Sequence, residues 1–416
     1  MRRVLVVLPF YGGSLPVGRY CASALRELGC QVEVFESPSF YSALTAVKSL
    51  NVSMERLEYL ENSFLQVVTQ SVLATVDNFE PDLVLAMAQA PLSRQGLSKL
   101  RKDGVRTAMW FVEDYRLFTY WRAFAPLYDV FAVIQKEPFL SELTATGVAN
   151  AIYLPMAADP AVHRPLDLSE EDRRLFGAEL SFMGAGYPNR RVAFRHLMRL
   201  GLKIWGTEWE DDPVLFPLVQ MQGRRISSEE TVRIFNAAVI NLNLHSSVNG
   251  RELVPRGDFV NPRTFEIAAS GGFQLVDSRS LLPELFAEDE LAVFSSIEEL
   301  LAKIAWFRER PQERLEYAER GRARVLAEHT YAARMRSILA FADERAPAKA
   351  RQRDQHWPDM PEHLRNELHV LYETLQLPRN AGFADVVLAI RRKNDTLTPV
   401  ETAVLFLDEW KKQYSM

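Results

Sequence analysis

Short runs of aliphatic residues alternate along the chain with longer stretches in which apolar residues recur every three or four positions. The first run, residues 4–8, is apolar at every position, which is typical of a parallel strand covered on both faces. A helical pattern over residues 17–28 ends at Gly29, and residues 31–35 favour a second strand. This order predicts a strand–helix–strand unit with the right-handed crossover of parallel sheets.

The alternation then continues to about residue 155. A helical stretch covers residues 52–78, and the apolar runs that follow occupy residues 81–86, 106–111, 129–134 and 151–154. Strands that alternate with helices over this length predict one doubly wound α/β domain. We expect this Rossmann-like domain to occupy residues 1–158.

The pattern restarts in the second half of the chain. Strands are predicted at residues 180–183, 202–205, 239–244 and 273–276, with helices at 191–200, 228–237 and 262–270 between them. Ser296 is a suitable N-cap with Glu299 placed for a capping box, and helices then run to about residue 342. A second Rossmann-like domain is therefore expected at residues 159–345.

The last part of the chain has a different character. Residues 346–355 are small, polar and charged, which is typical of a linker. Helical patterns follow at residues 362–375, 384–392 and 399–414. The sequence thus predicts an α/β protein with two facing doubly wound domains and a linker and helical extension over residues 346–416.

Composition narrows the classes of function. The 416 residues carry a net charge of −5 at pH 7, so no broad basic surface is expected for nucleic acid or an anionic membrane, and phosphate must be bound locally. Two cysteines imply no disulfide framework and favour a reducing compartment. No run of about 18 apolar residues occurs, and residues 1–13 lead into a glycine turn instead of a cleavage site. We therefore expect a cytoplasmic protein without a transmembrane segment.

The sharpest motif begins at Asn261. Asn261 is a good N-cap, and Pro262 suits the first helical position. The helix start then offers N–H groups at Arg263 and Thr264 to an anion, and the Arg263 guanidinium adds a fork for a diphosphate. Glu266 could accept hydrogen bonds from ribose hydroxyls. The same residues would also suit an ordinary, well-capped helix.

Glycine turns follow several of the predicted strands. Gly184 and Gly186 lead from a strand into a helix that carries Arg190, which suits a phosphate site or a simple tight turn. Further glycines at such turns are Gly206 and, after the motif helix, Gly271 and Gly272. In the first domain, Gly12, Gly13 and Ser14 follow the first strand, at the edge where open α/β sheets bind ligands.

Two further residues at strand ends could carry chemistry. Asp114 follows the strand at residues 106–111, where a carboxylate could act as general base for an acceptor hydroxyl or could be a solvated loop residue. His245 follows the strand at residues 239–244, and we expect it at the donor site with Gly206, Gly271 and Gly272, although a lone histidine is more often structural than catalytic. The chain has no Asp-x-Asp pair for a donor-bound metal and no Walker, His-Glu-x-x-His or Gly-x-Ser-x-Gly motif. We expect no metal and no cofactor.

An ordered series of short motifs resembles the CgeB-like (spore maturation protein) family of glycosyltransferases, with a group 1 type of C-terminal domain. The series comprises Tyr128-Asp129-Val130-Phe131, Tyr153-Leu154-Pro155-Met156 with Ala157-Ala158-Asp159-Pro160, His163-Arg164-Pro165, Ser181-Phe182-Met183-Gly184, Pro188-Asn189-Arg190, Arg263-Thr264-Phe265-Glu266 with Gly271-Gly272, and Glu328-His329-Thr330-Tyr331 with Arg334. It covers roughly residues 1–342 and leaves out the tail.

The resemblance implies a GT-B fold, in which the second domain holds a nucleotide-diphospho-sugar and the first domain holds the acceptor. It matches Glu266 to the ribose-binding glutamate of group 1 enzymes, and Arg263, Thr264, Gly184 and Gly186 to the diphosphate region. The arginine–lysine pair of many group 1 enzymes has no counterpart here, so Arg190 and Arg263 are the expected substitutes.

The mechanism expected from this resemblance is metal-independent transfer of a sugar to a protein, glycan or small-molecule acceptor, with bacterial cell-surface or appendage glycosylation as the context. Two alternatives stay open. One is a nucleotide-sugar 2-epimerase of the same architecture. The other is a non-catalytic scaffold that binds partners through the C-terminal helices, which could also dimerise or recognise the acceptor.

Overall fold

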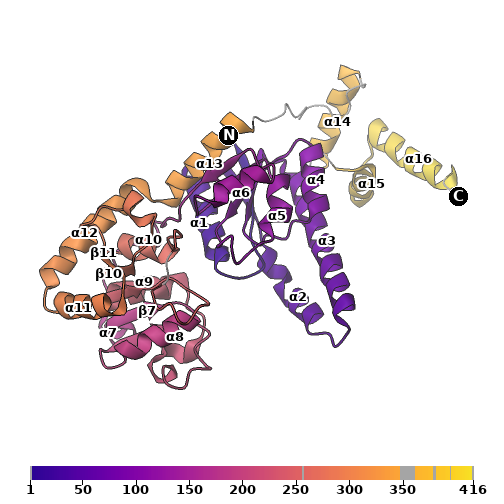
Figure 1. The fold of residues 1–416 in the computed structure, drawn as a ribbon. Coiled ribbons are helices and arrows are strands. Elements are labelled where there is room, and N and C mark those ends of the chain that lie inside the picture. The colour runs from indigo at the N-terminus through magenta and orange to yellow at the C-terminus, as the bar shows by residue number, and fades with distance from the viewer. Residues whose placement is uncertain (1, 255–256, 347–360, 378–380, 394, 415–416) are drawn as a thin grey trace.

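The computed structural model describes residues 2–254, 257–346, 361–377, 381–393 and 395–414. The predicted linker, residues 346–355, lies outside this range except for its first residue. Two α/β lobes make up the body of the molecule (Figure 1), and each contains one sheet whose strands are all parallel. The predicted fold class is confirmed.

The first sheet has the strand order β2-β1-β3-β4-β5-β6. Its strands are β1 (Arg3–Val7), β2 (Gln31–Phe35), β3 (Leu83–Met87), β4 (Arg106–Phe111), β5 (Val130–Val133) and β6 (Ala151–Tyr153). The helices of this half are α1 (Ser14–Glu27), α2 (Tyr41–Lys48), α3 (Met54–Phe79), α4 (Arg94–Lys102), α5 (Trp121–Phe124) and α6 (Phe139–Ala145).

The second sheet has the order β11-β10-β9-β7-β8. Its strands are β7 (Ala178–Met183), β8 (Leu202–Trp205), β9 (Ala238–Asn243), β10 (Gln274–Asp277) and β11 (Ala292–Phe294). The helices that follow β6 are α7 (Glu170–Phe176), α8 (Pro188–Ala193), α9 (Ser228–Ala237), α10 (Pro262–Ala269), α11 (Ile297–Arg308), α12 (Pro311–Glu328) and α13 (Tyr331–Arg345). Short 3-10 turns lie at Ser37–Phe40, Ala125–Leu127, Phe194–Leu197, Phe216–Leu218, Gln220–Gly223 and Leu282–Glu284.

The alternation of side chains along β1 explains why this strand is apolar throughout. Val4 and Val6 belong to the core on the side of α1 and α13, whereas Leu5 and Val7 belong to the core on the side of α3. All four are fully buried. Burial of one such side chain contributes about 1.5–3 kcal/mol, so apolar residues on both faces of β1 stabilise the lobe.

Helix α13 belongs to the second half in sequence but packs on the first lobe. It contacts α1 and β5, and Arg106 on β4 forms an ion pair with Asp343 at 3.0 Å. The Arg334 guanidinium donates to the carbonyl oxygens of Pro155 (2.7 Å) and Met156 (3.1 Å). The segment between the lobes is therefore braced by the start of α13, beside the parallel bridge of Ala158 and Thr330.

One local expectation needs correction, and several short elements were missed. The Ser296 hydroxyl accepts from the N–H of Glu299 at 3.2 Å, but the Glu299 carboxylate accepts from Ser295 instead, so the predicted capping box is wrong. The short strand β11 and the helices α2, α4, α5, α6 and α7 were also not predicted, because segments of this length show a clear period only where a cap or a glycine marks their ends.

The C-terminal extension contains α14 (Glu362–Thr374), α15 (Phe383–Arg392) and α16 (Pro399–Tyr414). Leu371 and Tyr372 of α14 pack with Val386 and Ile390 of α15 in a small core of their own. Across the part of the chain that the structure describes, no helix combines the length and the hydropathy needed to cross a membrane.

Candidate functional site

Two adjoining cavities lie between the lobes, where loops from the carboxyl ends of both sheets meet. Gly13 and Val17 of the first lobe and Tyr187 and Pro262 of the second line both cavities. We name each after a carboxylate in its wall: the Glu113 cavity has a volume of about 390 Å³, and the Glu266 cavity about 400 Å³. These volumes fall within the usual range for small-molecule sites.

The start of α10 forms one wall of the Glu266 cavity. The Asn261 side chain accepts from the Thr264 N–H at 3.2 Å and caps the helix, and Pro262 occupies its first position. Pro262, Arg263 and Glu266 line the cavity, so the positive end of the helix dipole faces it. The motif predicted a helix start at this position, but its Thr264 N–H is not offered to an anion as expected, because the Asn261 side chain already accepts from it.

Glu266 is 4% exposed and has cationic and polar neighbours. Its carboxylate forms an ion pair with Arg263 one turn earlier, and His163 Nε2 lies 3.9 Å from Oε1. The Asp159 N–H donates to His163 Nδ1 at 3.1 Å, so the imidazole proton sits on Nε2, towards Glu266. Burial lowers the pKa of His163, which favours this neutral form.

The predicted glycines form two turns in close contact. A Cβ at Gly206, where φ is +124°, would lie 2.5 Å from the Gly184 carbonyl oxygen, and both residues line the Glu266 cavity. A Cβ at Gly186 would lie 2.0 Å from the Glu208 carbonyl oxygen. The backbone of each glycine therefore packs directly against the backbone of the other turn. Only glycine allows this close approach, because any Cβ would clash.

Arg190 does not line either cavity. Its Nε and Nη2 donate to the Leu244 carbonyl oxygen at 2.9 and 2.7 Å, and its Nη1 donates to that of Ala185 at 3.0 Å. Burial lowers its pKa to about 10. Arg190 thus ties the Gly184–Gly186 turn to the end of β9 through hydrogen bonds to protein carbonyl oxygens, and its guanidinium also lies over the rings of Phe182 and Tyr187.

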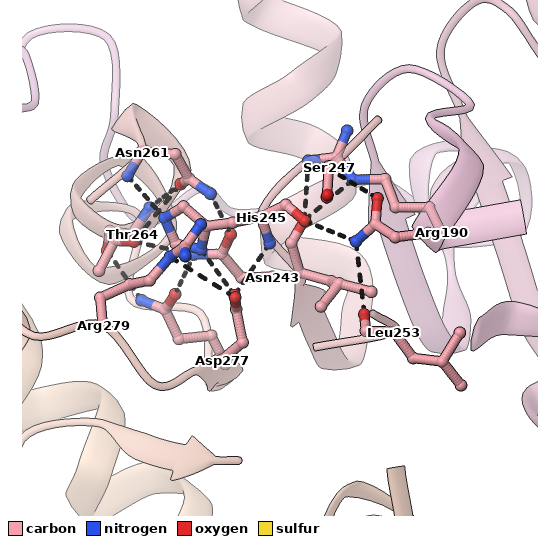
Figure 2. A network of polar contacts seen from close by, with 12 residues as sticks. Arg190, Asn243, His245, Ser247, Leu253, Asn261, Thr264, Asp277 and Arg279 are labelled. Atoms are coloured by element: carbon pink, nitrogen blue, oxygen red, sulfur yellow. Dashed lines mark hydrogen bonds and ion pairs between the residues drawn. The ribbon is translucent and has the colours of Figure 1, made fainter. Parts of the chain in front are cut away.

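His245 belongs to a buried network behind the start of α10 (Figure 2). Its Nδ1 lies 2.6 Å from Asp277 Oδ1, and its Nε2 accepts from the Asn261 N–H at 2.8 Å. The Asn243 side chain links Asn261 to Thr264 in the same network, with bonds of 2.8 and 3.0 Å. His245, Asn261 and Thr264 therefore fix the helix start from behind, outside the walls of the two cavities.

Gly271 and Gly272 lie at the other end of α10 from the cavities. Gly271 has φ +74°, and a Cβ at Gly272 would lie 2.9 Å from both Asn241 Nδ2 and the Phe235 carbonyl oxygen. Gly271 and Gly272 make the tight turn from α10 into β10 that the sequence predicts after the motif helix. Neither lines the Glu113 or the Glu266 cavity.

The first lobe supplies the other side of the site. Gly12, Gly13, Ser14 and Asp114 all line the Glu113 cavity, as expected from their positions at strand ends. The Asp114 Oδ1 accepts from the Arg116 N–H at 2.9 Å, so this carboxylate also shapes its own loop. The structure thus brings the loop of Gly12, Gly13 and Ser14, together with Asp114 and the start of α10, to one cleft.

Several cavity residues were missed from the sequence. Arg225 lines the Glu266 cavity and donates from Nη2 to the Gly12 carbonyl oxygen at 2.7 Å, across the two lobes. Tyr20 on α1 lines the same cavity and donates to the Ser228 hydroxyl at 2.8 Å. No spacing rule pointed to Arg225 or Tyr20, because each meets its partner only when the lobes pack together. Glu113, which lies beside the predicted Asp114 at the end of β4, lines the other cavity.

Among the described residues, no group of three or more His, Cys, Asp or Glu side chains could hold a metal ion. The charged groups at the start of α10 are instead Arg263 and Glu266.

Acid should destabilise the fold through two buried histidines. His245 and His329 each use one ring nitrogen as an acceptor, from Asn261 and Arg334 respectively, so protonation breaks that bond. Burial lowers the pKa of each to about 4. Because the unfolded chain takes up these protons near pH 6.5, the free energy of unfolding should fall as pH drops from 6.5 towards 4.

The expected loss is several kcal/mol, at ~1.4 kcal/mol per pKa unit for each histidine. Chemical denaturation between pH 7.5 and 4.5 would measure it. Replacement of His329 with Gln should flatten the profile in this window. A stability that stays constant from pH 7 to pH 5 would contradict the prediction.

The chain is similar to known proteins both in sequence and in fold. The profile of the family described as "Glycosyl transferase-like" matches residues 190–340. The spore protein CgeB of Bacillus subtilis (strain 168) is 22% identical in an alignment over 254 residues that covers 58% of this chain and 77% of CgeB.

Solved structures share the fold. The Anabaena protein HepE, solved in complex with UDP and glucose, has a TM-score of 0.57 with 11% identity, over 83% of this chain and 100% of HepE. Sucrose-phosphate synthase from Thermosynechococcus elongatus has a TM-score of 0.57 with 12% identity, over 83% of this chain and 99% of the synthase.

The fold is therefore GT-B, two Rossmann-like lobes with a cleft between them, as the sequence predicted. The sequence matches to a glycosyl transferase-like domain and to CgeB, together with this fold, support a glycosyltransferase. Within that class, the predicted resemblance to the CgeB-like glycosyltransferases is confirmed.

Proposed function

We propose that the protein transfers a sugar from a nucleotide-diphosphate donor, bound in the Glu266 cavity, to an acceptor bound in the Glu113 cavity. The observation that carries this proposal is the wall made by α10, where a helix N-terminus, Arg263 and a buried carboxylate face one space. HepE, which shares the fold, was solved with UDP and glucose, which favours a uridine diphosphate sugar as the first donor to test.

Each group in this wall has a defined part in the proposal. Glu266 accepts hydrogen bonds from the ribose hydroxyls, and Arg263 with the helix dipole holds the diphosphate. Gly184 and Gly206 let the nucleotide approach the backbone closely. Arg225, which reaches Gly12 across the cleft, supplies a second positive charge beside Arg263.

The reaction proposed is metal-independent. The leaving nucleoside diphosphate gains negative charge as its bond to the anomeric carbon breaks, and preorganised N–H groups and guanidiniums stabilise that charge. Contacts between the lobes, such as Arg225 with Gly12 and Tyr20 with Ser228, keep water out of the donor cavity when it is closed.

The acceptor and the setting are also proposals. The acceptor is a protein, glycan or small molecule, and the similarity to CgeB favours a bacterial cell-surface or appendage polymer modified in the cytoplasm. The helices α14–α16 have a core of their own and expose Phe406 and Trp410, which suits dimerisation or recognition of the acceptor.

A thermal-shift screen against UDP, GDP, dTDP, CDP and their sugars, without added metal, tests the donor site. At a ligand concentration 100 times Kd, binding adds about 2.7 kcal/mol to stability, so one diphosphate should raise Tm by several degrees. No shift with any nucleotide would reject the proposal and favour a binding scaffold. Turnover of the donor to an isomer without any acceptor would instead point to an epimerase.

A further inference from the structure

The wall of the Glu113 cavity contains the carboxylates of Asp114 and Glu113. Hydrogen bonds from other side chains hold the Glu113 carboxylate in position. Glu113 follows β4 and is half-buried in the cavity wall. The Tyr120 hydroxyl donates to its Oε2 at 2.8 Å, and the side-chain amide of Gln89 donates to its Oε1. Both oxygens are therefore fixed in position by the first lobe alone.

The backbone beside this carboxylate is strained. Gln89 follows β3 and has φ +62°, in the left-handed region that residues with a Cβ seldom adopt. This conformation directs the Gln89 N–H to the Tyr120 hydroxyl at 3.1 Å, while that hydroxyl donates to Glu113. Strain of this kind costs about 1–3 kcal/mol and concentrates at functional sites.

Electrostatics favour Glu113 as a group that exchanges protons. Burial raises the pKa of Glu113, although the hydrogen bonds from Tyr120 and Gln89 act in the opposite direction. Burial and the neighbouring carboxylate raise the pKa of Tyr120, so its hydroxyl stays a donor at neutral pH. A carboxylate moved towards neutral pH is a stronger base than an ordinary glutamate.

Asp114 is placed differently. Its Oδ1 accepts from the Arg116 N–H, and its carbonyl oxygen accepts from the N–H groups of Leu117 (3.1 Å) and Phe118 (3.0 Å). These bonds shape the loop that closes one side of the cavity. Glu113 is thus better placed than Asp114 to accept a proton.

We propose that Glu113, rather than Asp114, accepts the proton of the acceptor hydroxyl, an inference that rests on the proposed function. The acceptor oxygen forms a bond to the anomeric carbon, and the bond from that carbon to the diphosphate oxygen breaks. The hydroxyl proton moves to the Glu113 carboxylate, and the nucleoside diphosphate leaves with the electron pair. Gln89 and Tyr120 are positioning residues that hold the carboxylate.

The charged groups around the Glu113 cavity affect which acceptor can bind there and how the reaction rate depends on pH. Besides Glu113, the charged groups that the described residues place in its wall are Asp114, Arg116, Glu252, Asp258 and Arg279. Among these described groups carboxylates outnumber guanidiniums, which disfavours a phosphorylated acceptor and favours an uncharged hydroxyl compound. Water and a methyl glycoside are therefore suitable acceptor probes.

The test is release of UDP from UDP-glucose by the full-length protein, with water or methyl glucoside in place of the natural acceptor. Glu113→Gln should lower the rate by about 10²-fold or more, because general base catalysis is worth 10²–10⁴-fold. The affinity for UDP should stay within twofold of wild type. The fall in rate on the acidic side of the wild-type pH profile should vanish in this variant.

Asp114→Asn and Tyr120→Phe are the matched variants. Asp114→Asn should lower the rate less than tenfold, whereas Tyr120→Phe should give an intermediate loss and shift the acidic limb. A Glu113→Gln variant as fast as wild type, or a larger loss in Asp114→Asn, would overturn the inference and leave the donor site standing. Wild-type protein that binds UDP-glucose but releases no UDP to either probe would also overturn it. Absence of nucleotide binding would reject the inference together with the proposed function.

Discussion

Replacement of Glu266 with alanine should weaken the binding of the nucleoside diphosphate by about 10²-fold. Hydrogen bonds to a charged group contribute about 1.5–3 kcal/mol each, and 2.7 kcal/mol corresponds to 10²-fold in Kd. Glu266 is buried in the cavity wall, so no other side chain of α10 can take its place there. Isothermal titration with the nucleotide found in the screen would measure the loss.

The fold should survive this change. Arg263 loses its ion pair, but about a third of its side chain is exposed, so its charge remains hydrated. Glu319→Ala is a matched control, because Glu319 is exposed on α12 and lines neither cavity. Unchanged affinity in Glu266→Ala, with an unchanged Tm, would reject the ribose assignment.

Replacement of Asp277 with alanine should lower the free energy of unfolding by about 3–5 kcal/mol, as for other buried charges that lose a partner. Asp277 has no solvent exposure and accepts from the His245 N–H at 2.9 Å as well as from its imidazole. Arg279 lies 3.6 Å away. The truncation leaves two buried donors of His245 without an acceptor.

This variant should also weaken donor binding, because His245 holds Asn261, the cap of α10. Urea denaturation would give the stability, and titration of the nucleotide would give the affinity. Asp289→Ala is the control, since this carboxylate is 65% exposed and its ion pair lies at the surface. A loss below 1 kcal/mol in Asp277→Ala would show that the network is not a structural support.

Within the site, sequence reasoning succeeded where one segment contains the whole feature. Asn261, Pro262, Arg263 and Glu266 lie within six positions, and local rules of capping and helix geometry place them together. Local rules could not decide whether Arg190 and His245 face a ligand or support the fold. Whether an arginine faces a ligand or a carbonyl such as that of Leu244 depends on residues more than fifty positions away.

The sequence by itself determined the two doubly wound α/β domains, because burial on both faces leaves an apolar run in each parallel strand. It also determined the position of the motif helix, because a helix cap depends on neighbouring residues, whereas the GT-B arrangement was implied by the resemblance to the CgeB-like family. Only the tertiary structure decided which residues share the cleft. Arg225 meets Gly12, and Gln89 meets Glu113, through the packing of lobes and strand ends distant in sequence. The tertiary structure alone also placed α13 on the first lobe, since a helical period shows an apolar face but not the surface that covers it.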